Sequence, residues 1–171
     1  MTNRNLQKLV LAALFAALCT VMTLVIQIPS PIQGYLNLGD CAVLLAAWVL
    51  GPAYGAAAAG LGSMLADLLS GYAYYAPGTL AVKGAMAAAA GLLFRGMSRR
   101  SAHLLPAQLV SGIAAEGIMV AGYFGYACLL LGKGLGAAAS VPGNAVQGLF
   151  GLVGAVTVYA LLSRSRVLAH L

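Results

Sequence analysis

The side chains that could do chemistry in this sequence are few, and they stand inside long apolar stretches. Only three residues are acidic, Asp40, Asp67 and Glu116, and Lys83 is similarly surrounded by apolar residues. If these stretches cross a membrane, an ionisable group within them costs about 2.5–3.5 kcal/mol on insertion scales. Such a group normally faces the interior of a helix bundle, where it is paired or functional.

Asp67 and Lys83 flank the short segment SGYAYYAPG, which contains glycine, proline and three tyrosines. A turn in this segment would bring the two charges together as a structural ion pair. Alternatively, one or both face a polar ligand, with Tyr75 beside them. At helical spacing Asp67 shares a face with Ser63 and Gly60, so a stripe of small residues lies below the carboxylate.

Glu116 and Tyr123 share a helical face, seven positions apart, in AAEGIMVAGYFGY. A polar group followed by soft apolar and aromatic residues suits a site for a ring-bearing ligand. The alternative is a protonated glutamate that hydrogen-bonds to a neighbouring helix.

Asn144 and Gln147 lie three positions apart in VPGNAVQG. Their carboxamides could bind a neutral heterocycle, because an amide both donates and accepts, although Asn144 also suits a helix cap.

The stretch GYLNLGD ends at Asp40, where the chain re-enters apolar sequence. The simplest role for Asp40 is at the positive N-terminal end of a helix, where its carboxylate accepts hydrogen bonds from free backbone N–H groups. Asn37 and Tyr35 on the same segment are then better placed to reach over a ligand.

The elements that position these groups are transmembrane helices. Hydrophobic residues make up 62% of the chain and charged residues 7%, against roughly 45–50% and about 25% in soluble domains. The 22 glycines and the alanine runs suit close helix packing in lipid. The three cysteines lack CxxC spacing and indicate small buried side chains, so we expect no metal site and no cofactor.

The apolar pattern predicts an all-α, integral membrane bundle of six transmembrane helices, forming one domain over residues 1–171. We expect the spans at 9–28, 40–50, 52–70, 79–94, 105–131 and 142–162. The second span is short, and only Gly51 and Pro52 separate it from the third, which predicts a tight hairpin.

The net charge of +6 follows membrane topology and does not indicate nucleic acid binding. The basic residues are concentrated at the N-terminus, between the fourth and fifth spans, and at the C-terminus: Arg4, Lys8, Arg95, Arg99, Arg100, Arg164 and Arg166. The positive-inside rule makes these three regions cytoplasmic in a cell membrane. No phosphate-binding GxxxxGK[ST] motif occurs, so uphill transport would need a partner or an ion gradient.

The whole chain resembles the substrate-binding S components of energy-coupling factor (ECF) vitamin transporters. The resemblance is carried by YLNLGDCAVLLAAWVLGPAYGAAAAGLGSMLADLLSGYAYYAPGTLAVKG, EGIMVAGYFGY and NAVQGLFG, and by alanines spaced like an AxxxA element. These segments are similar to the riboflavin-type branch, which includes carriers for pyridoxine and hydroxymethylpyrimidine.

The resemblance implies a binding protein that takes a small ring-containing vitamin from outside and rotates in the membrane to release it inside. It implies a T subunit and two cytosolic ATPases as partners, with the first helix docking on the T subunit through Ala12, Ala13, Ala16 and Ala17. Carried over by position, it favours these ligand contacts: Asn37, Asp67, Tyr75, Lys83, Glu116, Tyr123, Asn144 and Gln147. Compact loops and few aromatics favour pyridoxine or hydroxymethylpyrimidine over riboflavin.

Two other classes of function stay open at this point. An intramembrane enzyme would use Asp40 and Asp67 as a dyad that activates water, although the sequence has NLGD where such enzymes have GxGD. A solitary carrier would work without an ATPase module. On the resemblance we expect a transport protein and not an enzyme.

Overall fold

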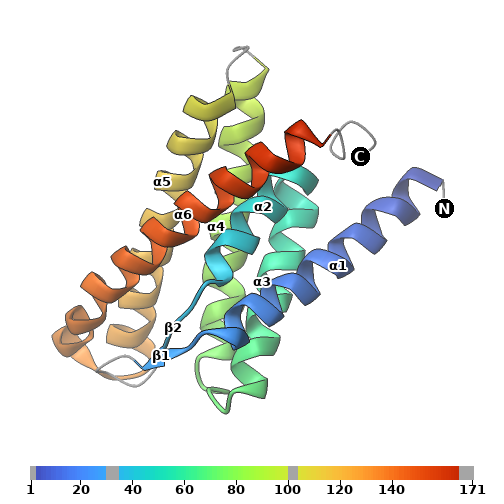
Figure 1. The fold of residues 1–171 in the computed structure, drawn as a ribbon. Coiled ribbons are helices and arrows are strands. Elements are labelled where there is room, and N and C mark those ends of the chain that lie inside the picture. Colours follow the sequence, from blue (N-terminus) through green and yellow to red (C-terminus); the bar gives the residue numbers. More distant parts are fainter. Residues whose placement is uncertain (1–2, 30–34, 100–103, 166–171) are drawn as a thin grey trace.

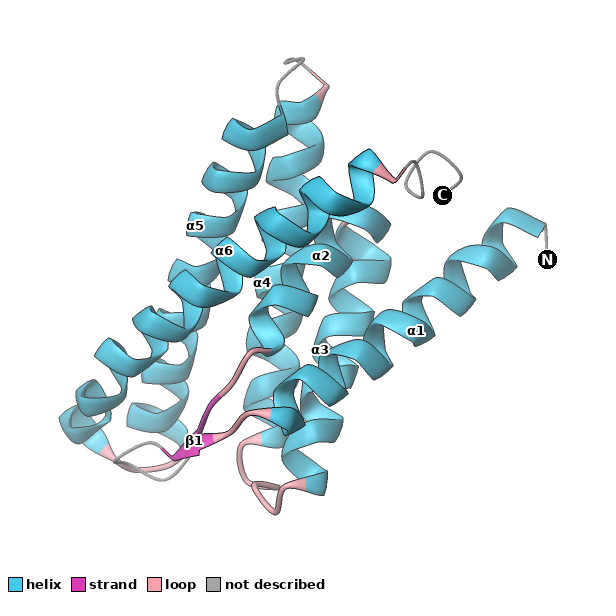
Figure 2. Ribbon diagram, in the orientation of Figure 1, coloured by secondary structure: helices cyan, strands magenta, loops and turns pink. Residues whose placement is uncertain are grey.

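The computed structural model describes residues 3–29, 35–99 and 104–165 of the 171-residue chain. It is an all-helical membrane bundle with one very short sheet, as Figure 2 shows. The long helices are α1 (Asn3–Val25), α2 (Gly39–Leu50), α3 (Pro52–Leu69), α4 (Ala76–Ser98), α5 (Leu104–Gly125) and α6 (Val141–Arg164). Between α5 and α6 lie a π-helical turn, η1 (Tyr126–Leu130), and a 3₁₀ segment, η2 (Gly134–Ser140).

The predicted spans coincide with these helices, with differences at their ends. Helix α4 begins at Ala76 and continues to Ser98, so it is longer than the predicted span in both directions. The connection between the fifth and sixth predicted spans, residues 132–141, is largely 3₁₀ helix. The sequence pattern did not predict the strands β1 (Ile28–Pro29) and β2 (Tyr35–Leu36), which pair antiparallel. Arg100 and Arg166 lie outside the described residues.

Three connections gather at one end of the bundle, opposite the described ends of the chain. Figure 1 shows β1, β2, the α3–α4 turn and the η1–η2 region together at the lower end. The described starts of α1 and α5 and the end of α6 lie toward the other end. Successive helices of the bundle therefore run in alternating directions between these two ends.

Helix α2 is the central element of the bundle. It has 12 residues, and its side chains are buried along almost the whole length. An apolar helix of this length is too short to span a bilayer and suits a buried core position. Among the described residues, four helical segments are long and apolar enough to cross a membrane: Asn5–Val25, Ala76–Ser98, Leu104–Leu130 and Gly134–Arg164.

The predicted hairpin between α2 and α3 is confirmed. Gly51 has φ 82°, a conformation that favours glycine, and Pro52 occupies the first turn of α3. Arg95 on α4 donates a hydrogen bond of 3.0 Å to the carbonyl of Leu50, which satisfies one of the free carbonyls at the end of α2.

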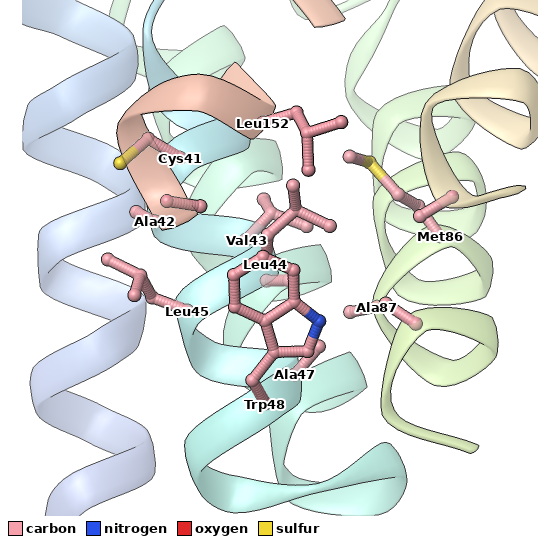
Figure 3. Close-up of a cluster of buried hydrophobic side chains, with 14 of the residues drawn as sticks. Cys41, Ala42, Val43, Leu44, Leu45, Ala47, Trp48, Met86, Ala87 and Leu152 are labelled. Carbon is pink, nitrogen blue, oxygen red and sulfur yellow. The ribbon is translucent and has the colours of Figure 1, made fainter. Parts of the chain in front are cut away.

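The apolar core surrounds Trp48, as Figure 3 shows. Its ring packs against Phe94 of α4 and Tyr159 of α6, with ring centres 5.8 and 5.9 Å away, and the fully buried Met86 and Ala87 of α4 belong to the same cluster. The indole N–H donates a 3.0 Å hydrogen bond to Ser111 on α5, so burial leaves this polar group satisfied. The core thus holds α2 against α4, and the Trp48 hydrogen bond ties it to α5. This packing positions Asp40 at the start of α2.

Candidate functional site

A buried ion pair occupies the start of α2. The Lys83 ammonium on α4 donates to Asp40 Oδ1, and their side chains are only 2% and 0% exposed. Gln147 on α6 donates from Nε2 to the other carboxylate oxygen, Oδ2, at 2.6 Å. Because three helices contribute to this network, Asp40 connects α2, α4 and α6 through charge-assisted hydrogen bonds.

Gln147 also holds the segment that precedes α2. The backbone N–H of Asn37 donates to Gln147 Oε1 at 2.9 Å. The side-chain oxygen of Asn37 in turn accepts from the backbone N–H of Gly39 at 2.8 Å. Both polar atoms of the Gln147 carboxamide are therefore engaged within the protein, one by the loop and one by Asp40.

Two expectations about these charges are wrong. Lys83 does not form its ion pair with Asp67, because α2 lies against α4 and presents Asp40 to the ammonium. Asp40 does not cap its own helix either. Its side chain turns into the bundle, and the residue at the helix start, Leu38, makes no side-chain capping bond. The cap-like contact comes from Asn37.

Asp67 belongs to a second group of polar residues on α3, α4 and α5. Its Oδ1 accepts a 2.6 Å hydrogen bond from the phenol of Tyr35 on β2. Tyr123 on α5 donates to Thr79 Oγ1 on α4 at 3.1 Å. The two groups meet where Lys83 Nζ lies 5.5 Å from the centre of the Tyr123 ring, within the range of a cation–π contact.

Tyr35 and Tyr75 stand at the loop end of the bundle. Burial, and then the hydrogen bond to Asp67, raise the pKa of the Tyr35 phenol, which therefore remains a hydrogen-bond donor. Burial also raises the pKa of Tyr75. Lys133 donates to the Tyr75 hydroxyl at 3.1 Å, and the Tyr75 ring lies 6.5 Å from that of Tyr123. Tyr75 therefore ties the α3–α4 turn to the α5–α6 connection.

Glu116 and Asn144 complete the predicted set. Glu116 is 8% exposed, and it interacts electrostatically with Asp40 and Lys83. Neither of its carboxyl oxygens has a hydrogen-bond partner among the described residues. Asn144 is buried on the face of α6 that carries Gln147, one turn earlier.

Two glycines of α6 make room for the carboxylates. A Cβ on Gly148 would lie 2.8 Å from Glu116 Oε2, and a Cβ on Gly151 would lie 2.6 Å from the Cβ of Asp40. Real Cβ contacts are not this short, so a side chain at Gly151 would push α6 away from α2, and a side chain at Gly148 would displace the Glu116 carboxyl group. The glycines that follow Gln147 in the sequence thus let α6 approach the network directly.

Five of the eight residues predicted as ligand contacts come together around Asp40: Asn37, Lys83, Glu116, Tyr123 and Gln147. Tyr75 adjoins this group through its ring contact with Tyr123, and Asp67 is joined to the segment before α2 by its hydrogen bond from Tyr35. The prediction did not include Asp40 or Thr79. The only signal for these two residues in the sequence is that they are polar. Their partners, Lys83 and Tyr123, lie on other helices, so local sequence does not reveal the contacts.

The family model described as "ECF-type riboflavin transporter, S component" matches residues 3–164. This chain belongs to that family. It is therefore a multi-pass membrane protein of the ECF transport systems.

Two curated proteins resemble this S component in sequence. A thiamine precursor transporter, HmpT, of Lactococcus lactis subsp. cremoris is 29% identical over 170 residues, covering 98% of this chain and 95% of HmpT. An uncharacterized protein from the gap 3′ region of Pyrococcus woesei is 38% identical over 135 residues, covering 78% of this chain and 86% of its own.

A solved structure confirms the fold. The structure described as "Structure and mechanism of the S component of a bacterial ECF transporter" superposes with a TM-score of 0.70 and 19% sequence identity. The match covers 94% of this chain and 97% of that one. At 19% sequence identity, the superposition is evidence for a shared fold and not for a shared ligand.

The alanines predicted for docking face two directions in this S component. Ala12 is buried against α2 and α3, together with Ala46 and Ala58. The carbonyl of Ala16 lies against Gly62 of α3 and accepts a 2.9 Å hydrogen bond from Thr20. Ala13 is exposed on the outer face of α1, and so is Ala17. Of the four alanines, only these two are exposed.

The geometry does not favour the alternative of a catalytic aspartyl dyad. In such a dyad two carboxyl groups share one proton at close range. Here Asp40 binds Lys83 and Gln147, whereas Asp67 binds Tyr35. Each aspartate thus has its own set of partners.

Proposed function

We propose that this S component binds a small ring-containing vitamin or vitamin precursor, of the pyridoxine or hydroxymethylpyrimidine type, from outside the cell. The T subunit and two cytosolic ATPases then drive its delivery inward. The observation that carries the proposal is the buried polar network at the loop end of the bundle. It contains every acidic residue of the chain, and three of its carboxyl oxygens, Oδ2 of Asp67 and both oxygens of Glu116, have no hydrogen-bond partner among the described residues.

Buried polar atoms are normally hydrogen-bonded, because an unsatisfied buried group costs about 1–3 kcal/mol. A polar ligand that enters the network would supply the missing donors. The aromatic rings of Tyr75 and Tyr123, which pack edge to face with centres 6.5 Å apart, adjoin the same region and would give a ring-bearing ligand aromatic surface beside the polar groups. The name of the similar Lactococcus protein, a thiamine precursor transporter, points to the same class of ligand.

Riboflavin is the second candidate, and the description of the matching family favours it. The engagement of Gln147 and Lys83 within the protein leaves less hydrogen-bonding surface for a large polar ring system. We therefore place the smaller rings first.

The orientation that we propose has the N- and C-termini in the cytoplasm. Arg95, Arg99 and Arg164 lie toward the end of the bundle at which the described chain begins and ends. Lys133 is at the opposite end. The positive-inside rule then places the polar network near the outer face, where a ligand from outside would arrive. Ala13 and Ala17 on α1 would form the docking face for the T subunit, since small residues permit close helix contact.

A thermal-unfolding screen of the purified protein tests the ligand. Hydroxymethylpyrimidine, pyridoxine, thiamine and riboflavin would each be added at increasing concentration. Binding linkage predicts about 2.7 kcal/mol of added stability at 100 times the dissociation constant. If none of the four compounds stabilises the protein, the proposal of a vitamin-binding network is wrong.

Uptake measurements test the partners. Cells that express this S component together with a T subunit and paired ATPases should accumulate the labelled ligand. Cells without that module should bind the ligand and not accumulate it. Accumulation in cells that lack the module would indicate a solitary carrier.

A further inference from the structure

The three acidic residues of the chain differ in how far the protein itself satisfies them. Asp40 has hydrogen bonds at both oxygens, from Lys83 and from Gln147. Asp67 accepts a hydrogen bond from Tyr35 at Oδ1, whereas its Oδ2 has no hydrogen-bond partner among the described residues. Glu116 has none at either oxygen within the part of the chain that the structure describes. Hydrogen bonds from within the protein therefore satisfy both oxygens of Asp40. Glu116 is the acidic residue that can accept the most hydrogen bonds from a ligand.

The surroundings of Glu116 hold it in place without hydrogen-bonding to it. The residue is more than nine-tenths buried, at 8% exposed. Gly148 of α6 lies directly against its carboxyl group, and a methyl group added there would lie 2.8 Å from Oε2. A buried carboxyl without partners destabilises a fold, and an apolar side chain of similar size would avoid that cost. This arrangement is expected of a carboxyl group whose hydrogen-bond partners come from a bound ligand.

We infer that Glu116 recognises a ring amidine, meaning a ring nitrogen with an amino group on the adjacent carbon. This inference rests on the proposed function and narrows it to an aminopyrimidine, as opposed to a hydroxypyridine or a flavin. The two free oxygens of one carboxyl group match the two adjacent nitrogens of an amidine edge. Two parallel hydrogen bonds form whether the shared proton lies on the carboxyl group or on the ring.

The alternatives in the proposed ligand class fit this edge less well. Pyridoxine has a ring nitrogen but no amino group beside it, so its ring-nitrogen edge offers Glu116 one hydrogen bond in place of two. The flavin imide has an N–H between two carbonyl groups, and those carbonyl oxygens would face the carboxyl oxygens. An amidine is also basic enough to accept the proton, and this makes both hydrogen bonds charge-assisted and about twice as strong as neutral ones.

The experiment compares two ligands of nearly equal shape by titration calorimetry. One is hydroxymethylpyrimidine, and the other is the analogue in which a carbonyl oxygen replaces its amino group. The unaltered protein should bind the amino compound at least about tenfold more tightly, because only this compound forms the charge-assisted pair. In Glu116→Gln the ratio should fall to within about threefold, since a carboxamide forms neutral hydrogen bonds with either ring.

Two further variants keep the result interpretable. Ile113→Ala changes a 63% exposed residue on the lipid-facing side of the same helix, and it should preserve the ratio. Glu116→Asp keeps a carboxyl group on a shorter side chain, so it should bind both ligands more weakly and still prefer the amino compound. It also serves as the test if Glu116→Gln does not fold.

The outcomes separate this inference from the proposed function. Binding of pyridoxine or riboflavin in preference to the aminopyrimidine would overturn the inference and leave the proposed function standing. A preference for the amino compound that persists unchanged in Glu116→Gln would show that another group reads the amidine, and would also overturn the inference. If no ring compound binds, the proposed function itself fails.

Discussion

Removal of Lys83 should be among the most destabilising single changes in this protein. The variant Lys83→Met has nearly the same length but loses the ammonium that pairs with Asp40. Both side chains are almost completely buried, at 2% and 0% exposed, so solvent cannot replace the lost partner. Removing one member of a buried ion pair typically costs 3–5 kcal/mol, because the other charge is left uncompensated. We expect about that loss in the free energy of unfolding.

The double variant Lys83→Met with Asp40→Asn separates this cause from a packing defect. The asparagine carries no charge, and its carbonyl oxygen can still accept from Gln147. Because no uncompensated charge remains, we expect the double variant to regain about 2 kcal/mol or more relative to Lys83→Met alone. Lys8→Met, at an exposed position of α1, is the matched control and should change stability by less than about 0.5 kcal/mol.

Trp48 provides the assay. It is the only tryptophan of the chain, and it lies two turns along α2 from Asp40, in the buried core. Its fluorescence should report unfolding by denaturant in detergent micelles. The reasoning is refuted if Lys83→Met costs less than about 1 kcal/mol, or if the double variant is as unstable as the sum of its two single variants.

Three further predictions concern packing, docking and the unpaired carboxyl group. Gly151→Ala should lower the free energy of unfolding by about 1–3 kcal/mol, because its methyl group would lie 2.6 Å from a side-chain carbon of α2. Gly117→Ala should leave the free energy of unfolding unchanged, because a Cβ at this position meets nothing within 4 Å. Equal losses of stability in the two variants would contradict the packing argument. Ala13→Leu should leave ligand binding intact and weaken co-purification with the T subunit, whereas Ala16→Leu should lower thermal stability by disturbing the contact between α1 and α3. Glu116→Met should stabilise the ligand-free protein and abolish its stabilisation by hydroxymethylpyrimidine. A ligand-induced shift that survives this change would exclude Glu116 from the site.

The sequence was sufficient to predict the helices and the polar and charged residues that would be buried within them. Apolar stretches of about 20 residues have few structural solutions in a bilayer, so the spans followed from length and composition. The hairpin at Gly51 and Pro52 followed from the backbone preferences of those two residues. The two-residue strands β1 and β2 were not predictable, because two residues form no periodic pattern.

The pairing of charges could not be predicted, for a physical reason. Asp67 and Lys83 lie close in sequence across a short turn, which made them the natural pair. Asp40 and Lys83 are 43 positions apart, and they meet only because the short helix α2 inserts between the longer ones. Which face α2 presents to α4 depends on the packing of Trp48 and its neighbours, and that information is not local in the sequence.

The same packing explains why Asp40 and Glu116 have different roles although both are buried acids near one lysine. Asp40 lies on the central helix and receives Lys83 from one side and Gln147 from the other, so it stabilises the junction of three helices. Glu116 lies opposite a glycine of α6, which offers space and no donor. A bundle optimised only for stability would place an apolar side chain there. The buried Glu116 carboxyl group therefore lowers the stability of the ligand-free protein. A ligand that supplies the missing hydrogen-bond donors would remove this penalty when it binds.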